Sequence, residues 1–358
     1  MTITHPEQRI KNLLRIVAQQ DASDLHLVVG RYPTIRTEGR LISLEEQDNI
    51  LTPADTKAMA EIILNEENKK KLIENGQVDF SHNLEEKARF RVNIFFQQGN
   101  LSIACRLIPK NIRTLEQLNL PETLYDFTKY SQGLFLVVGP VGHGKSTTLA
   151  ALINQINHNQ AKHIITIEDP IEYIYEQDKC IINQREVFQD AKSFQTALKA
   201  VFREDANVVL VGEMRDLETI STAVTAAETG HLIFATLHTN DSPQTIDRII
   251  DIFPSHQQNQ VRMQLASSLL GVVSQRLVPG VNGGRLPALE VMIKNHAVEN
   301  LIREGKTYQL DNVIETGSAQ GMMSLDKSLA ELVRRGMVAV DVAAGYAKDS
   351  KNFQNMLQ

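Results

Sequence analysis

The stretch VVGPVGHGKSTTL, residues 137–149, contains the phosphate-loop pattern G-x-x-x-x-G-K-[ST]. An apolar run, LFLVV at 134–138, precedes the pattern, and the segment after it has apolar side chains at helical spacing. A buried strand, a glycine-rich turn and a helix are the context that this pattern needs. The sequence therefore predicts a nucleotide site at this turn rather than a plain glycine-rich turn. In such a loop the glycines admit backbone amides close to phosphates, Lys145 neutralises the terminal phosphates and Ser146 can ligate Mg²⁺.

Short apolar runs alternate with helical patterns beyond this loop. HIITI (163–167), NVVLV (207–211) and HLIFAT (231–236) resemble strands, and LETISTAVTAAETG (217–230) resembles a helix. This alternation predicts an α/β domain with a parallel sheet covered on both faces, whose ligands bind at the carboxyl ends of the strands.

Two acidic motifs follow predicted strands. In IEDPIEY, Glu168 can orient and deprotonate an attacking water, whereas Asp169 can equally cap a helix. In NVVLVGEMRD, Glu213 is placed to hold Mg²⁺ through water or to position the nucleophile. Arg215 and Asp216 are expected to pair structurally.

Two histidines flank the strand in ETGHLIFATLHTND. A histidine there can bind a phosphate or relay its loss to a neighbour, although a histidine beside a strand is more often a structural donor. The functional role is assigned to His238 ahead of His231. No third ligand at a suitable spacing suggests zinc.

Composition excludes several classes of protein. The 358 residues carry a net charge of −6 and no Lys/Arg stripe, which argues against a dedicated nucleic-acid binder. Two distant cysteines fit a reduced, cytoplasmic setting. The N-terminus lacks a signal-peptide core, and no apolar run approaches the ~20 residues that span a bilayer, so membrane contact is expected to be peripheral or through a partner.

The regions on either side of the predicted nucleotide-binding core lack its alternation of strands and helices. Residues 1–112 are expected to form a small α+β domain that begins with a helix containing Ile10, Leu13, Leu14 and Val17 on one face. Residues 113–130 are expected to link it to a core at 131–295, and 296–358 to be helical.

These motifs, in this order, resemble the PilT/VirB11-like secretion ATPases. ASDLHL, ARFRVN, GKSTTLAALI, TIEDPIEY, LVGEMRDLETI, TAAETGHL, TLHT and NLIRE all read like that family, from about Ala22 to about Gly336. Within it, the chain is most similar to the branch that retracts type IV pili for twitching motility. Extension and type II secretion motors usually carry a four-cysteine zinc element, which this sequence does not have.

The resemblance implies a cytoplasmic homohexameric ATPase that acts at the inner-membrane face with a pilus platform protein. It implies a PAS-like N-terminal domain and a RecA-like ATPase domain, with ATP and Mg²⁺ as ligands. Glu168 matches the Asp box, Glu213 the Walker B motif, and His231 with His238 the His box. An arginine of the N-terminal domain, Arg91 or Arg106, is implied to reach the γ-phosphate. The candidate nucleotide-binding residues are Gly139, Gly142, His143, Gly144, Lys145, Ser146 and Thr147.

The sequence departs from the family pattern at four positions. Val141 and His143 stand where the phosphate loop usually has Thr and Ser, Asn207 replaces an acid, and Glu299 replaces an arginine in the segment linked with retraction. An accessory (PilU-like) pilus ATPase is therefore an alternative, and a RecA-type DNA-acting ATPase is a more distant one. For His143 two interpretations stand open: its ring points away from the phosphates, or it approaches them as an imidazolium.

Overall fold

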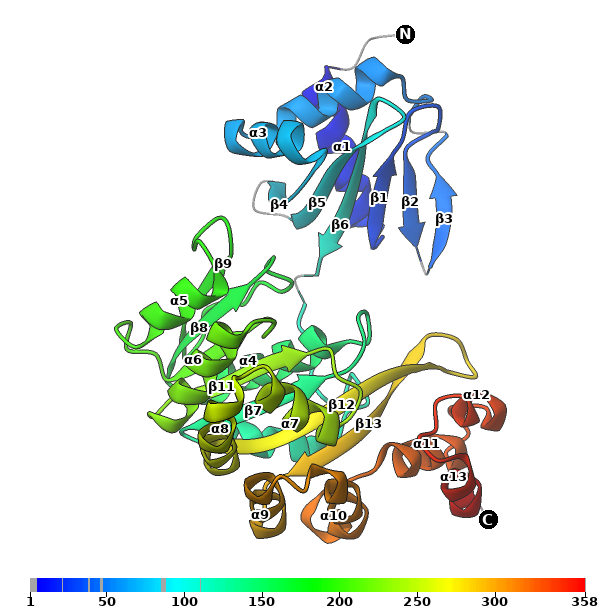
Figure 1. Cartoon of the computed structure of the whole chain (residues 1–358). Coiled ribbons are helices and arrows are strands. Elements are labelled where there is room, and N and C mark those ends of the chain that lie inside the picture. The colour runs from blue at the N-terminus through cyan, green and yellow to red at the C-terminus, as the bar shows by residue number, and fades with distance from the viewer. Residues whose placement is uncertain are drawn as a thin grey trace. The chain divides into compact units, whose positions relative to one another are not determined.

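The protein is described by a computed structural model that covers residues 5–20, 22–37, 39–45, 48–84, 88–109 and 111–357. The chain divides into two compact units (Figure 1). The first extends to Asn111, and the second runs from Ile112 onward apart from residues 172–174.

The first unit is an antiparallel sheet with helices packed on it. Its strand order is β3-β2-β1-β6-β5-β4, and α1 buries the predicted face of Ile10, Leu13, Leu14 and Val17. The helix α3 ends at Gly76, whose left-handed φ of 73° is typical of a glycine C-terminal cap. The elements are α1 (Pro6–Gln19), β1 (Asp24–Leu27), β2 (Thr34–Thr37), β3 (Arg40–Ser43), α2 (Pro53–Ile63), α3 (Glu66–Asn75), β4 (Gln77–Leu84), β5 (Ala88–Gln97) and β6 (Asn100–Ile108).

The second unit is built on a seven-stranded sheet of order β13-β12-β7-β11-β10-β8-β9. All four predicted strands are confirmed, as β7, β8, β10 and β11, and they pair in parallel. The bounds are β7 (Gly133–Val138), β8 (His163–Glu168), β9 (Ile181–Glu186), β10 (Val208–Val211), β11 (Leu232–Leu237), β12 (Leu269–Pro279) and β13 (Arg285–Ile293).

The expectation of a wholly parallel sheet was wrong at one edge. β12 runs parallel to β7, but β13 returns antiparallel to β12. The return is possible because a short turn containing Gly283 and Gly284, both with positive φ, reverses the chain between the two strands. The sheet is therefore mixed, with an antiparallel hairpin extending beyond the end of β7.

Helices connect the strands of the second unit. The predicted helix at 217–230 is α6, and its apolar residues Ile220, Val224 and Ala227 are buried in the main core. A 3₁₀ segment, η1 (Glu122–Lys129), precedes β7, and the helices between the strands are α4 (Lys145–Asn159), α5 (Phe194–Val201), α6 (Leu217–Glu228), α7 (Ser242–Asp251) and α8 (Ser255–Ser268).

Residues from His296 onward are helical, as expected, and they join the sheet through β13. Val291 of β13 forms an isolated bridge with Met323. The elements are α9 (His296–Glu304), η2 (Thr307–Gln309), α10 (Leu310–Thr316), η3 (Gly317–Gln320), α11 (Leu325–Arg334), α12 (Val340–Ala344) and α13 (Ser350–Leu357). Across the described ranges, no helix has both the length and the apolar character to cross a bilayer.

Asn207 and Glu299, two of the residues that depart from the family pattern, have structural roles. Asn207 Oδ1 accepts the backbone N–H of His163 at 2.9 Å, and its own N–H donates to the His163 carbonyl, so it joins the starts of β8 and β10. Glu299 pairs with Arg303 one turn along α9. An arginine at position 299 would instead repel Arg303.

Candidate functional site

The sheet order brings four loops together. β7, β11, β10 and β8 are consecutive neighbours in the sheet and run parallel, so their carboxyl ends lie along one edge. The phosphate loop follows β7, His238 follows β11, Glu213 follows β10, and Glu168 ends β8. The phosphate loop, Glu168, Glu213 and His238 therefore lie along the edge where parallel sheets bind ligands.

The phosphate loop has the backbone that its glycines predict. Gly139, Gly142 and Gly144 have φ of 140°, 77° and 81°, a region that favours glycine. Gly144 is also the N-cap of α4, and it has no side chain that could cap the first-turn amides. Those amides and the helix dipole favour an anion at this end of α4. Ser146 and Thr147 lie in the same first turn, half-buried.

Lys145 is buried against its own loop. Its Nζ donates to the carbonyls of Gly139 and Pro140, at 2.9 and 3.0 Å, and lies 3.2 Å from His238 Nδ1. The ammonium is thereby held inside the loop that nucleotide phosphates occupy in this motif.

His238 connects the lysine to an acid. Its Nε2 lies 2.9 Å from Glu213 Oε1. An ammonium can only donate, so His238 Nδ1 accepts from Lys145 and Nε2 carries the hydrogen that Glu213 accepts. This fixes one tautomer and makes a continuous chain of three polar side chains from three neighbouring strand ends.

Glu213 is held ionised. Burial raises the pKa of its carboxyl, but the contacts with Arg215 and His238 outweigh burial and hold the pKa below its ordinary value. Arg215 Nη2 donates to Glu213 Oε2 at 2.7 Å, and Asp216 caps α6 through Thr219. Both have structural roles as expected, but with these partners rather than with each other.

Glu168 lies next to Glu213 along the edge. The N–H of Gly212 donates to the Ile167 carbonyl, which places the β10 loop against the end of β8. Glu168 is 7% exposed, and Gln184 Nε2 lies 3.5 Å from its Oε1. No helix begins at Asp169, since an irregular segment follows β8, so the helix-cap alternative for Asp169 was wrong.

The ring of His143 faces β12. His143 Nδ1 accepts the backbone N–H of Leu277 at 2.8 Å. The backbone of His143 does not adopt a positive φ, so backbone conformation does not explain a histidine at this position of the loop. This contact supports the interpretation in which the ring points away from the phosphates.

His231 is not brought to this edge. It precedes β11, and in the parallel register the next residue, Leu232, lies opposite Gly133 at the start of β7. Its Nδ1 lies 3.2 Å from the Ala226 carbonyl, and its ring packs edge-on against Phe202. Of the two histidines, only His238 touches the phosphate loop.

Arg91 and Arg106 lie in the first unit. They are direct partners across β5 and β6. Arg91 pairs with Asp79, and Arg106 Nε donates to Asp24 Oδ1 at 2.8 Å. The two residues are therefore paired on one ladder, and each guanidinium forms an ion pair with an aspartate of a different neighbouring strand.

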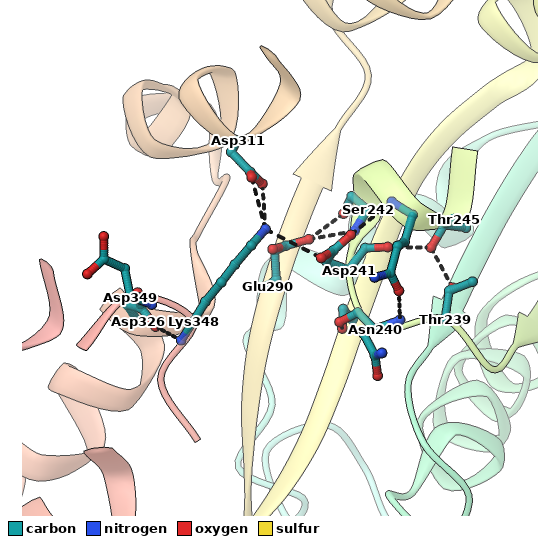
Figure 2. A network of polar contacts seen from close by, with 12 residues as sticks. Thr239, Asn240, Asp241, Ser242, Thr245, Glu290, Asp311, Asp326, Lys348 and Asp349 are labelled. Atoms are coloured by element: carbon teal, nitrogen blue, oxygen red, sulfur yellow. Dashed lines mark hydrogen bonds and ion pairs between the residues drawn. The ribbon is translucent and has the colours of Figure 1, made fainter. Parts of the chain in front are cut away.

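The segment after His238 is tied to β13 and to the C-terminal helices (Figure 2). Glu290 of β13 accepts both the N–H and the hydroxyl of Ser242 at 2.7 Å. Lys348 Nζ lies 3.5 Å from Asp241 and 2.8 Å from Asp311. A cavity of about 250 Å³ lies beside this cluster.

The contribution of β12 to the phosphate loop was not predicted from the sequence. Gln275 contacts Gly139 and His143 of the phosphate loop and Thr148 in the first turn of α4, although more than 120 residues separate it from each of them in the chain. Only the run LLGVV at 269–273 indicated a strand there. No local pattern indicated that this strand lies beside β7 and the phosphate loop.

Comparison with known proteins gives a consistent result. The family model described as "Type II/IV secretion system protein" matches residues 5–309. The "Type IV pilus retractation ATPase PilT" of Pseudomonas aeruginosa is 44% identical over 347 residues, which cover 96% of this chain and 99% of the relative. The "Type IV pilus ATPase PilU" of the same organism is 37% identical over 349 residues, 97% and 91% of the two chains.

Solved structures agree. The crystal structure of "the Pilus Retraction Motor PilT and Bound ADP" superposes with a TM-score of 0.90 at 43% identity, covering 97% of this chain and 99% of that one. The Legionella pneumophila ATPase DotB superposes with a TM-score of 0.79 at 24% identity, over 96% of each chain, which shows a shared fold.

Proposed function

The chain belongs to the type II/IV secretion system protein family, and from this membership we propose that it is an ATP-hydrolysing motor that retracts type IV pili. The observation that carries the proposal is the chain of Lys145, His238 and Glu213 at neighbouring strand ends, directly against a phosphate loop. The solved relative with a TM-score of 0.90 is named for a bound ADP, which supports a nucleotide at this loop.

We assign each residue a role from its position in the site. Lys145 and the first-turn amides of α4 bind the phosphates of ATP. Glu168 orients the attacking water and accepts its proton. His238 contacts both Lys145 and Glu213, so a change in the position of either is passed to the other. We keep His231 as part of the same motif by family resemblance alone.

Mg²⁺ is the second ligand that we propose. The ionised Glu213 carboxylate and the Ser146 hydroxyl are the hard oxygen donors that this cation prefers. Bound there, it would neutralise charge on the phosphates. We assign Arg91 or Arg106 to the γ-phosphate, because a guanidinium matches the spread charge of a transferred phosphoryl group.

The proposal also covers the domains of the chain, its oligomeric state and its cellular location. We assign a PAS-like N-terminal domain to residues 1–112, a linker to 113–130, a RecA-like core to 131–295 and a helical region to 296–358. The active form is a cytoplasmic homohexamer at the inner-membrane face, where a pilus platform protein is its partner.

Retraction is favoured over the accessory role. Identity to the PilT relative is 44%, against 37% to PilU, over similar lengths. PilU-like activity stays the second candidate. Deletion of the gene should abolish pilus retraction and twitching if the chain is the main motor. A strain that still retracts pili at wild-type force and rate would favour the accessory role.

The catalytic assignment is tested by substitution. Lys145→Ala removes the charge that binds the terminal phosphates and should abolish both tight nucleotide binding and turnover. Glu213→Gln should keep nucleotide binding within a few-fold and lower kcat at least about a hundredfold, the size typical of a lost charged catalytic group. Steady-state ATPase assays and titration with a fluorescent ADP analogue measure the two effects.

Glu218→Gln is the matched control, because it also removes an acid near the start of α6 but lies exposed. It should leave both measurements unchanged. Near wild-type turnover by Lys145→Ala or by Glu213→Gln would reject the assignment. Stimulation of turnover by single-stranded DNA would favour the DNA-acting alternative.

A further inference from the structure

The edge of β12 continues past its neighbouring strand. β7 pairs with β12 as far as Val138, opposite Ser274. The next residues of β12, from Gln275 to Pro279, still pair with β13 on their other side. The phosphate loop lies against this extension in place of a strand.

Gln275 attaches the base of the loop to β12. Its Nε2 donates to the His143 carbonyl at 2.8 Å, and its Oε1 accepts the Thr148 hydroxyl at 2.7 Å. Its side chain is buried, with the residue 3% exposed. A Cβ added to Gly139 would come within 2.4 Å of the Gln275 carbonyl oxygen, so the two backbones are in direct contact. Gln275 therefore holds the loop at its first glycine and at the His143 carbonyl, and it holds the first turn of α4 through Thr148.

His143 attaches the middle of the loop. Its Nδ1 can accept the Leu277 N–H only while that nitrogen carries no proton. Burial, together with the positive charges of Arg276 on β12, Arg285 on β13 and Lys145 on α4, lowers the pKa of His143. The surroundings from each of these elements thus favour the neutral ring.

We propose that His143 is a positioning residue of the nucleotide site, whose neutral imidazole holds the phosphate loop on the extended edge of β12. The proposal rests on the proposed nucleotide site and goes beyond it. Protonation of the ring would replace the acceptor by a donor that faces the Leu277 N–H. The loop would then lose its contact with Leu277, while Gln275 still holds the His143 carbonyl and the Thr148 hydroxyl.

The proposal gives a pH dependence of definite sign. A histidine whose pKa is lowered in the folded state contributes its stabilisation fully above its ordinary value of 6.5, and loses it as pH falls through the lowered value. Nucleotide affinity of the wild-type chain should therefore be constant from pH 8.5 to 7 and fall on further acidification.

The experiment titrates the full-length chain with a fluorescent ADP analogue from pH 8.5 to 5.0. His143→Asn places an amide oxygen where Nδ1 lies, so it keeps the acceptor but does not titrate. His143→Ala removes the acceptor. At pH 7.5 the alanine variant should bind about fivefold more weakly than wild type, the factor that corresponds to one hydrogen bond. The asparagine variant should match wild type at pH 7.5 and bind more tightly than wild type at pH 5.0.

The wild type and His143→Asn differ only at residue 143 and bind the same ligand, so the ratio of their affinities isolates the effect of His143. Parallel curves, or a wild-type affinity that increases in acid, would overturn the proposal. A wild-type affinity that increases in acid would show an imidazolium that contacts phosphate. Lys145→Ala is included because it tests the nucleotide site separately from the His143 contact. If Lys145→Ala abolishes binding, the nucleotide site stands whatever the His143 curves show. If wild type binds no ADP at any pH, the site and this inference both fail.

Discussion

Glycines of the phosphate loop are constrained by two different physical effects. At Gly139 the backbone has φ of 140°, and an added Cβ would lie 2.4 Å from the backbone oxygen of Gln275. At Gly142 φ is 77°, but an added Cβ would meet no atom within 4 Å. The first position is restricted by conformation and by contact, and the second by conformation alone.

We therefore expect Gly139→Ala to destabilise the nucleotide-free protein more than Gly142→Ala does. Conformational strain in the left-handed region costs about 1 kcal/mol, and a clash with backbone adds roughly another 2 kcal/mol because β12 cannot move away cheaply. Urea unfolding of the two variants measures the difference. Equal destabilisation would show that the loop does not rest on β12.

At the scale of elements, β13 and α7 are joined by a buried acid. Glu290 is 3% exposed, and Ser242 at the start of α7 donates two hydrogen bonds to it. Burial raises the pKa of Glu290, against the opposing effects of Ser242 and Lys348. The folded state therefore favours the protonated acid. The protonated acid contributes its full stabilisation below pH 4.5, the ordinary pKa of glutamate. This stabilisation is lost as pH rises through the raised pKa of Glu290.

Glu290→Gln keeps an oxygen for Ser242 and removes the ionisation. The free energy of unfolding of this variant, relative to wild type, should increase from pH 4.5 to pH 8, by about 1.4 kcal/mol for each unit by which the pKa is raised. Denaturant unfolding at several pH values measures it. Glu315→Gln, at an exposed residue beside the same cavity, should show no such trend. A pH-independent difference for Glu290→Gln would contradict the raised pKa.

At the scale of the whole molecule, the two units are predicted to share the reaction. Arg91 and Arg106 are in the first unit, whereas the phosphate loop is in the second. If either arginine stabilises the transferred phosphoryl group, the second unit alone should bind ADP normally and hydrolyse ATP at least tenfold more slowly than the full chain. Rapid hydrolysis by a verified monomer of the second unit would reject this division of work.

The structure indicates where that fragment should begin. Phe127 of η1 packs on Phe135 of β7 with ring centroids 4.2 Å apart. A fragment of residues 112–358 retains this contact, whereas one of residues 131–358 exposes Phe135 and should be less stable by a few kcal/mol, as for a large core deletion. Thermal unfolding of the two fragments is the control for the activity comparison.

Local sequence was enough to determine the phosphate loop, four parallel strands and the helices α4 and α6. Each depends on a pattern of neighbouring residues: apolar runs for β7 and β11, glycines where φ is positive, and the order of strand and helix around Lys145. The same order predicted that Glu168, Glu213 and His238 would meet, because parallel strands end at one edge.

Only the tertiary structure decided which partners these residues take. Strand order placed β11 between β7 and β10, and this made His238 the link between Lys145 and Glu213, while it left His231 at the far end of the strand. It also brought β12 against the phosphate loop, so that His143 meets Leu277. Contacts between residues that are far apart in the chain, such as His143 and Leu277 at a separation of 134 positions, depend on how the sheet is assembled. No local pattern of side chains encodes that assembly.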